Sequence, residues 1–278
     1  MDTILAEQGL SFTYLRDPSK SEAFDPCRIL DDLCEDGMAG AMLPWENGLR
    51  MAESDHVVLA TGTNDERCLG VVAASDLATE REPFLFLDAA YMAPKARASH
   101  LLQRMLAFAM LRVAGEAAVP NVIAACVQTS CYARDLREFG QSFTVAAQFP
   151  AAPEDIVIDL GMASLARRIV RVVRPGSRCE AATGAFRSSS ARHTGGIPNG
   201  IYGGISGGMS SGSPGSVHRI AETLVVVDLS AAHEATILED ARKLYRARPF
   251  RGTRRGVADA GAATLPDTRH RLRDATAF

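Results

Sequence analysis

The sequence predicts a mixed α/β fold with a mostly antiparallel sheet. Two apolar runs, HVVLATG (56–62) and RCLGVVAA (67–74), are separated by the polar turn 63–66, as in a β-hairpin. A third apolar run, FLFLDAAYM (84–92), precedes a long helix over 99–116, in which apolar residues recur at helical spacing. An antiparallel front half followed by alternating helices and strands is typical of a mixed sheet flanked by helices.

The other elements follow from local start and stop signals. Asp25 followed by Pro26 predicts the beginning of a helix, because Asp caps a helix and proline is tolerated in its first turn. Thr129 or Ser130 caps a later helix in the same way. In chain order, the remaining predictions are a strand over 10–16, a helix over 25–42, a strand over 121–127, a helix ending at Gly140, and closing strands over 143–148 and 155–160.

Composition changes after residue 161, and this change predicts the division of the chain. Glycine and serine dominate 176–216, which carries too little apolar surface to offset the entropy of ordering. A strand (224–229) and a helix (231–246) follow. Such a unit rarely folds alone, so we expect it to pack on the main domain. The predicted parts are an α/β domain (1–161), a basic amphipathic helix (162–175), a flexible linker (176–216), a strand–helix extension (217–250) and an Arg-rich tail (251–278).

Composition also limits the class of protein. The 278 residues are 47% hydrophobic and 23% charged, the balance of a globular protein. No run of 18 apolar residues is present, and the first residues lack the pattern of a signal peptide, so a cytoplasmic protein without a membrane span is expected. Six cysteines without CxxC spacing indicate reduced core thiols rather than a disulfide framework or a metal site.

The net charge of -3 conceals an uneven distribution. Residues 162–278 contain 18 basic and 9 acidic side chains, whereas residues 1–161 contain 12 basic and 24 acidic ones. The two halves therefore dock on each other, or the basic half meets an anionic partner. Nucleic-acid binding is the least favoured reading, because the basic half has few aromatic residues for stacking on bases.

Two segments carry a resemblance to a known family: FLFLDAAYMAPKARASHLLQRMLAFAM (84–110) and VIAACVQTSCYARDLREFG (122–140). A strand that ends near a proline, a loop beginning at Arg97 and a long helix resemble the GCN5-related N-acetyltransferase (GNAT) superfamily. The resemblance covers residues 10–160 in the order of their elements. It implies a GNAT-like fold and transfer of an acyl group from a thioester of coenzyme A, or of an acyl carrier, to a small-molecule or peptide amine.

The resemblance also implies where acetyl-coenzyme A or another acyl-coenzyme A binds. In the family, backbone N–H groups at the start of the long helix hold the pyrophosphate, because a helix N-terminus favours anions. Two positions depart from the pattern: His100 replaces the first loop glycine, and Leu102 replaces the second small residue. The residues assigned to the coenzyme are Met92, whose backbone would contact the pantetheine arm, and Arg97, Ala98, Ser99, His100, Leu101 and Leu102.

Asp88 is the best candidate for the general base of such a reaction. It is a charged residue within an apolar strand, and burial would raise its pKa. A carboxylate on this strand often serves as the base in the family. The family's acid tyrosine would fall at Leu136, so Tyr132, one turn earlier, is the candidate acid. By simple strand alternation, Tyr91 points away from the face that carries Asp88.

A second class of function stays open from the sequence. The altered loop, the displaced tyrosine and the basic C-terminal half are also typical of a catalytically inactive GNAT-like module that binds or assembles. Its partner would be another protein, or a second copy of the chain, reached through the C-terminal extension.

Overall fold

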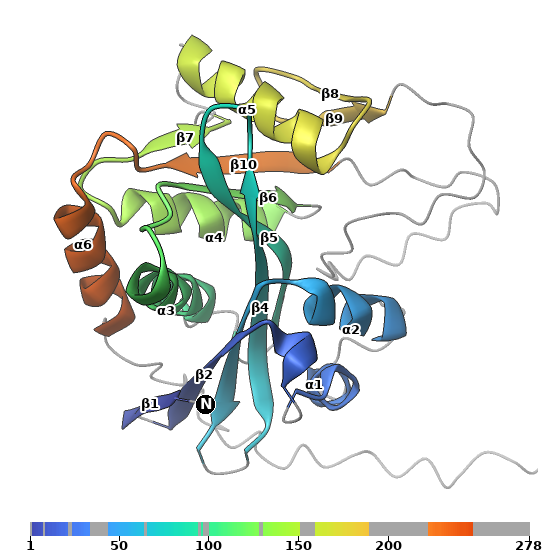
Figure 1. The fold of residues 1–278 in the computed structure, drawn as a ribbon, viewed down its shortest axis with the longest axis vertical. Coiled ribbons are helices and arrows are strands. Elements are labelled where there is room, and N and C mark those ends of the chain that lie inside the picture. Colours follow the sequence, from blue (N-terminus) through green and yellow to red (C-terminus); the bar gives the residue numbers. More distant parts are fainter. Residues whose placement is uncertain are drawn as a thin grey trace, which may run out of the picture.

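The computed structural model describes residues 2–7, 9–21, 24–33, 44–63, 66–93, 96, 100–127, 130–150, 159–188 and 222–246. Within these residues the core of the fold is one eight-stranded sheet with the order β1-β2-β3-β4-β5-β6-β10-β7 (Figure 1). Its strands are β1 (Asp2–Glu7), β2 (Leu10–Arg16), β3 (His56–Gly62), β4 (Cys68–Ala78), β5 (Pro83–Met92), β6 (Val122–Val127), β10 (Thr223–Asp228) and β7 (Ala147–Phe149).

The sheet is mixed and mostly antiparallel, as the sequence predicts. Every neighbouring pair runs antiparallel except β5 and β6, which are parallel and are joined through the long helix α3 (Leu101–Glu116). A parallel pair needs such a crossover, because the chain must return from the end of the first strand to the opposite end of the sheet before the second strand begins. The predicted hairpin is formed by β3 and β4.

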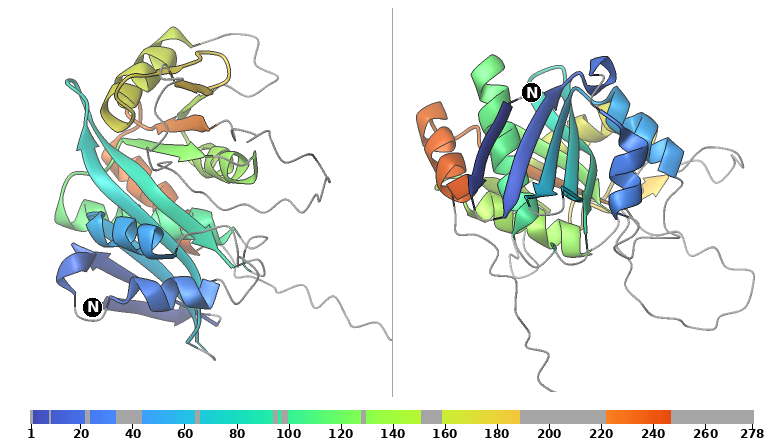
Figure 2. Two further views of the ribbon diagram at one scale, coloured as in Figure 1. Left: turned by 90° about the vertical axis from the view of Figure 1, so that its right-hand side faces the viewer. Right: turned by 90° about the horizontal axis from the view of Figure 1, so that it is seen from below.

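Helices cover both faces of the sheet (Figures 1 and 2). The helices α3, α4 (Ser130–Gln141) and α6 (Glu234–Arg246) lie on one face, and α1 (Pro26–Leu33), α2 (Pro44–Glu53) and α5 (Leu160–Val173) lie on the other. The central strand β6 is therefore buried on both sides. Its residues alternate between the two layers: Ile123 packs with the α3 layer and Ala124 with α5. This explains why its sequence is continuously apolar.

The strand–helix unit predicted near the C-terminus belongs to this sheet. β10 lies inside it, pairing with β6 on one side and with β7 on the other. The helix α6 packs on α3, where Tyr245 stacks on Phe108 with ring centroids 5.3 Å apart. The expected packing of the unit on the main domain is confirmed.

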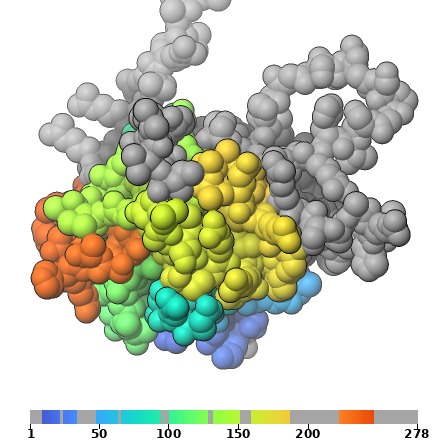
Figure 3. Space-filling model, turned by 90° about the horizontal axis from the view of Figure 1, so that it is seen from above, coloured from blue at the N-terminus to red at the C-terminus, as the bar shows by residue number. Residues whose placement is uncertain are grey.

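The strands β7 and β10 are antiparallel neighbours, yet residues 150–222 separate them in the chain. This excursion carries α5 and the small hairpin of β8 (Ser177–Cys179) and β9 (Phe186–Ser188). The backbone N–H of Phe186 donates to the carbonyl of Glu222 at 2.9 Å, which connects the hairpin to the beginning of β10. Figure 3 shows α5 and this hairpin from above, and there α5 lies beside the turn between β4 and β5.

Several predictions need correction. Residues 177–188, assigned to a flexible linker, form β8 and β9 because the hairpin packs against Thr223 and Leu224 of β10. The strand expected over 155–160 is wrong at its end: Asp159 caps α5 by accepting from the N–H groups of Gly161 and Met162, and Leu160 is helical. The remaining linker (189–216) and the tail (251–278) lie outside the described residues and stay predictions.

The helix predicted over 25–42 also differs from the structure in its extent. Asp25 caps α1 as predicted, accepting from the N–H groups of Cys27 and Arg28. The described part of α1 ends at Leu33, and a separate helix, α2, begins at Pro44. Neither α2 nor β1 was among the predicted elements. The omission of α2 matters, because its last turn lines the candidate site.

Candidate functional site

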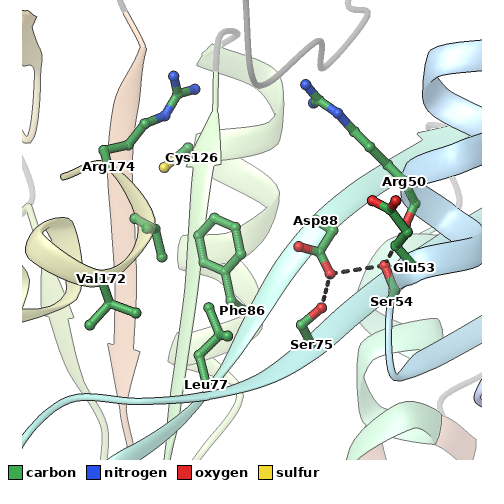
Figure 4. A pocket seen from close by; sticks show the side chains of 11 residues that line it. Arg50, Glu53, Ser54, Ser75, Leu77, Phe86, Asp88, Cys126, Val172 and Arg174 are labelled. Atoms are coloured by element: carbon green, nitrogen blue, oxygen red, sulfur yellow. Dashed lines mark hydrogen bonds between the residues drawn. The ribbon is translucent and has the colours of Figure 1, made fainter.

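Asp88 lies at a β-bulge in the middle of β5. In the ladder with β4, Ala73 pairs with Ala89 and Ala74 pairs with Leu87, so Asp88 is the extra residue between two consecutive pairs. A bulge bends the strand and redirects a side chain. The carboxylate of Asp88 points into a cavity on the α2 and α5 face of the sheet (Figure 4).

The bulge also changes the orientation of every later residue in β5. Since Ala73 and Ala74 are consecutive in β4, they face opposite sides, and so do their partners Ala89 and Leu87. Tyr91 pairs with Val71, which shares a face with Ala73. Asp88 is on that face too, because it is bonded to Ser75, which lies two residues after Ala73 in β4. Tyr91 and Asp88 therefore share a face, and the orientation expected from simple alternation is wrong.

Two serines hold one oxygen of the Asp88 carboxylate. Ser75 Oγ lies 2.6 Å from Oδ2, and Ser54 Oγ lies 2.9 Å from the same atom. Figure 4 shows the other oxygen facing the cavity. Because the serines belong to β4 and to the end of α2, the carboxylate is fixed by two elements besides its own strand.

Burial raises the pKa of Asp88 above the ordinary value of an aspartate. Its two serine hydrogen bonds and the charge of Arg50 act in the opposite direction, because they stabilise the charged form. A carboxylate whose pKa lies closer to neutrality than usual accepts protons more readily at physiological pH, which is the property needed in a general base.

The cavity has a volume of about 420 Å³ and is built by five elements. One side is polar and carries Arg50, Glu53 and Ser54, and the opposite side is mostly apolar and carries Leu77, Phe86 and Val172 (Figure 4). This size is suited to a small molecule or to the end of a chain. The lining residues are Arg50, Glu53, Ser54, Ser75, Leu77, Phe86, Asp88, Cys126, Val172, Val173 and Arg174.

The cavity lies where the two parallel strands diverge. β5 and β6 pair only over Leu85–Leu87 and Ile123–Ala125. Beyond this ladder come Asp88 on one strand and Cys126 on the other, and both line the cavity. Opening a sheet between parallel strands gives a ligand access to the interior of the fold without breaking an antiparallel ladder.

Two guanidinium groups flank the mouth of the cavity from opposite walls (Figure 4). Arg174, at the C-terminus of α5, forms an ion pair with Glu222, with 2.5 Å between Nη2 and Oε2. Burial raises the pKa of Glu222 as it does that of Asp88, and the charge of Arg50, on α2, acts against this rise at both carboxylates. Arg50 is therefore close enough to influence both the carboxylate on the floor of the cavity and the one that pairs with Arg174.

Of the residues assigned to the coenzyme, the apolar ones have their side chains in the core. Met92, Leu101 and Leu102 are each less than 5% exposed. The sulfur atoms of Met92 and Met105 and the tip of Leu101 fill the space left by Gly70, which has no Cβ. Any contact of these three residues with a ligand would therefore involve their backbone groups.

His100, which replaces an expected glycine, has a backbone conformation that glycine adopts most easily. It precedes α3 with φ 54° and ψ 25°, in the left-handed region. Its Nδ1 lies 2.9 Å from Oε1 of Gln103, whose Nε2 donates to Glu138 of α4 at 3.1 Å. The neighbouring Arg97, Ala98 and Ser99 lie outside the described residues.

Tyr132, the candidate acid, lies in the first turns of α4 and is buried in the core layer that contains α3. It is not among the residues that line the Asp88 cavity, and neither is Leu136, which is also buried. The structure therefore brings Asp88 together with Ser54, Ser75 and two arginines, but it does not bring Tyr132 into the same cavity.

The sequence reasoning missed the α2 and α5 residues of the site. Arg50 and Glu53 share one face of α2, and Ser54 follows the helix directly, with its N–H bonded to the carbonyl of Arg50. This spacing is informative only when a helix is expected there. Arg174 falls within the basic amphipathic helix predicted over 162–175, but nothing assigned it to a site. Cys126, expected to be a buried thiol, is buried and lies in the cavity wall.

Comparisons with known proteins give acetyltransferase structures. The chain is 17% identical to the diaminobutyrate acetyltransferase EctA from Paenibacillus lautus in complex with L-2,4-diaminobutyric acid and coenzyme A, over 50% of this chain and 81% of that one, with a TM-score of 0.35. It is 15% identical to a mutant of the toxin AtaT bound to the C-terminus of the antitoxin AtaR and acetyl-CoA, over 53% and 89%, with a TM-score of 0.31.

A third structure, titled as a phosphinothricin N-acetyltransferase, is 12% identical over 51% of this chain and 90% of that one, with a TM-score of 0.31. All three of these structures are described as acetyltransferases or as a toxin bound to acetyl-CoA. No protein-family model and no curated protein matches the sequence. At such low TM-scores, the chemistry of the site has to be inferred from this chain's own residues.

Two further observations concern the described part of the chain as a whole. No helix in it is long and apolar enough to cross a membrane. No three His, Cys, Asp or Glu side chains among these residues are grouped in a way that could hold a metal ion.

Proposed function

We propose that this protein is an acyltransferase that moves an acyl group from a coenzyme A or acyl-carrier thioester to an amine, with Asp88 as the general base. The position of Asp88 supports this most. It is a buried carboxylate at a bulge where two parallel strands diverge, with one oxygen held by two serines and the other facing a cavity of small-molecule size.

The reaction needs one base and one proton for the leaving sulfur. The cavity-facing oxygen of Asp88 accepts a proton from the ammonium group, and the freed amine attacks the carbonyl carbon of the thioester. The tetrahedral intermediate collapses with cleavage of the C–S bond, and the extra proton on its nitrogen passes to the departing sulfur, which leaves an amide and a thiol. Asp88 then returns its proton to solvent. Tyr132, the acid expected from the sequence, is buried outside the cavity and has no step in this scheme.

The donor side of the proposal rests on the segment that begins α3. Met92 would contribute backbone groups, and Arg97, Ala98, Ser99, His100, Leu101 and Leu102 would surround the pyrophosphate of acetyl-coenzyme A or another acyl-coenzyme A. The left-handed conformation of His100 supports this role, because it turns the chain into α3 as a glycine would and leaves the first N–H groups of the helix directed outward.

One observation favours the alternative of a catalytically inactive binding module. Two carboxylates of α4 lie close to His100: Gln103 links Glu138 to it, and Asp135, whose pKa is raised by burial, lies within range of an electrostatic interaction with it. Acidic groups beside a pyrophosphate site weaken anion binding. The two functions therefore differ in whether the chain binds coenzyme A at all.

Calorimetric titration with coenzyme A and acetyl-coenzyme A decides between them. The acyltransferase proposal expects saturable binding that Arg97→Glu abolishes and that Asp88→Asn preserves, since Asp88 lies on the acceptor side. Arg28→Gln, at an exposed position on α1, is the matched control. A folded protein that gives no heat with either ligand, and no thiol release from an acyl-carrier thioester, would leave the binding module as the function.

A further inference from the structure

The charge distribution of the Asp88 cavity points to the class of its acceptor, an inference that rests on the proposed acyl transfer. Its floor carries one carboxylate, and its mouth carries two guanidinium groups on opposite walls (Figure 4). Glu222 offsets the charge of Arg174, with which it forms an ion pair, while Arg50 acts on Asp88 and Glu222 together. Glu53, exposed at the end of α2, completes the set of charged lining residues.

An acceptor has to bring its amine to Asp88 past these guanidinium groups. Asp88 and Glu53 line the cavity and Glu222 offsets the charge of Arg174, so an ammonium group is accepted there. A molecule with a carboxylate near its amine suits the cavity well, because its carboxylate can meet Arg50 while its amine meets Asp88. The guanidinium group of an arginine matches a carboxylate with two parallel hydrogen bonds, and such charge-assisted bonds are among the stronger ones in proteins.

The rest of the acceptor meets an apolar wall. Leu77, Phe86 and Val172 line the side of the cavity opposite Arg50 and Ser54 (Figure 4). Val172 is 36% exposed, although it is a large apolar residue beside a cavity. An aliphatic or aromatic group on the acceptor would cover it and gain the free energy of removing apolar surface from water.

We propose that the acceptor is a free amino acid with an apolar side chain. Its ammonium group would face Asp88, its carboxylate Arg50, and its side chain the wall formed by Leu77, Phe86 and Val172. The excursion that carries α5 would thus contribute to the choice of acceptor, because it supplies Val172 and Arg174 to the cavity.

A matched set of three ligands tests the carboxylate directly: L-leucine, L-leucinamide and 3-methylbutylamine share the amine and the aliphatic group, but only the first has a carboxylate. Binding to the protein without donor is measured by calorimetry, and turnover is measured as thiol release from acetyl-coenzyme A. Loss of one charge-assisted interaction predicts affinity and kcat/KM about 10- to 100-fold lower for the amide and the amine.

Arg50→Gln separates this recognition from a general effect on the fold. It should reduce the preference for leucine over leucinamide to less than about 3-fold, whereas Arg28→Gln keeps the preference of the unmodified protein. Equal or better use of the amide or the amine would overturn the amino-acid inference and leave acyl transfer intact. Binding of none of the three would also overturn it. Carboxylate-dependent binding without any thiol release would support the inference and contradict the proposed acyl transfer.

Discussion

The hydroxyl of Ser75 donates a 2.6 Å hydrogen bond to Oδ2 of Asp88, across two strands at the residue where β5 bulges. Ser75 is paired with Phe86 in the ladder, so its contact with Asp88 is a diagonal one between residues on the same face of neighbouring strands. The bulge changes the orientation of the residues that follow Asp88. The predictions below begin with this pair.

Replacing Asp88 by Asn should lower kcat/KM by about 100- to 10,000-fold, the range for loss of a general base. The rate of the unmodified enzyme should rise with pH as Asp88 ionises, with the acidic limb displaced upward because its pKa is raised by burial. Measurement of kcat/KM against pH tests both statements. Asp88→Asn should still bind the thioester donor, and a variant that also loses donor binding would contradict the role of base.

The same raised pKa makes stability depend on pH. A group whose pKa is higher in the folded state contributes stability below its unfolded pKa, and this contribution is lost as pH rises through the folded pKa. The free energy of unfolding of the unmodified protein should therefore fall relative to Asp88→Asn as pH increases above the ordinary pKa of an aspartate. Urea unfolding of both proteins at several pH values measures the difference, and a constant difference would contradict it.

Replacing Ser75 by Ala should raise the pKa of Asp88 further, because the lost hydrogen bond stabilises the charged carboxylate. The acidic limb of the pH–rate profile should move to higher pH, and the rates should converge at alkaline pH. Ser54→Ala should act in the same direction. Ser19→Ala, at an exposed position, is the control. An equal loss of rate at all pH values would indicate a structural role instead.

The left-handed conformation at His100 predicts the order of two variants. His100→Gly and His100→Ala both lose the contact with Gln103, but alanine keeps the cost of a left-handed conformation, about 1–2 kcal/mol. His100→Gly should therefore be the more stable of the two by about 1 kcal/mol in urea unfolding, since part of this gain is offset by the greater freedom of glycine in the unfolded chain. Greater stability of the alanine variant would contradict the assigned conformation.

Gly184, in the turn between β8 and β9, should tolerate no side chain. Its φ is 68°, and a Cβ there would lie 2.6 Å from the carbonyl oxygen of Leu224 in β10. Gly184→Ala should cost about 2–4 kcal/mol, from strain and steric overlap together. Gly176 has a similar φ of 82° with nothing within 4 Å of a Cβ, so Gly176→Ala should cost only the strain. Thermal unfolding of the two variants compares them, and equal losses would contradict the close approach of the hairpin to β10.

The sequence predicted the parts of the fold that repeat in its own pattern. The hairpin of β3 and β4, the strand β5 and the helix α3 have long apolar periods, and Asp88 was identified because it interrupts one of them. The bulge was not predictable in this way, because period-2 alternation contains no mark of an inserted residue. The orientation of Tyr91 was therefore assigned to the wrong face.

The rest of the site depends on contacts between distant segments. Arg50 and Arg174 are far apart in the sequence, and nothing local indicates that they flank one cavity. The hairpin of β8 and β9 looked like a linker because its composition is polar. It is ordered by contacts with Glu222 and Thr223, which come from the far side of residues 189–221. Composition describes a segment alone and carries no information about such partners.

The interior place of β10 has a consequence for the order of events during synthesis. Strands β6 and β7 both leave the ribosome well before the strand that joins them, because β10 is completed only at Asp228. Until β10 has been synthesised, β6 has an unpaired edge, and edges of this kind invite wrong pairing. The part of the sheet between β6 and β7 can therefore form only after Asp228 has been added to the chain, well after both of its neighbours.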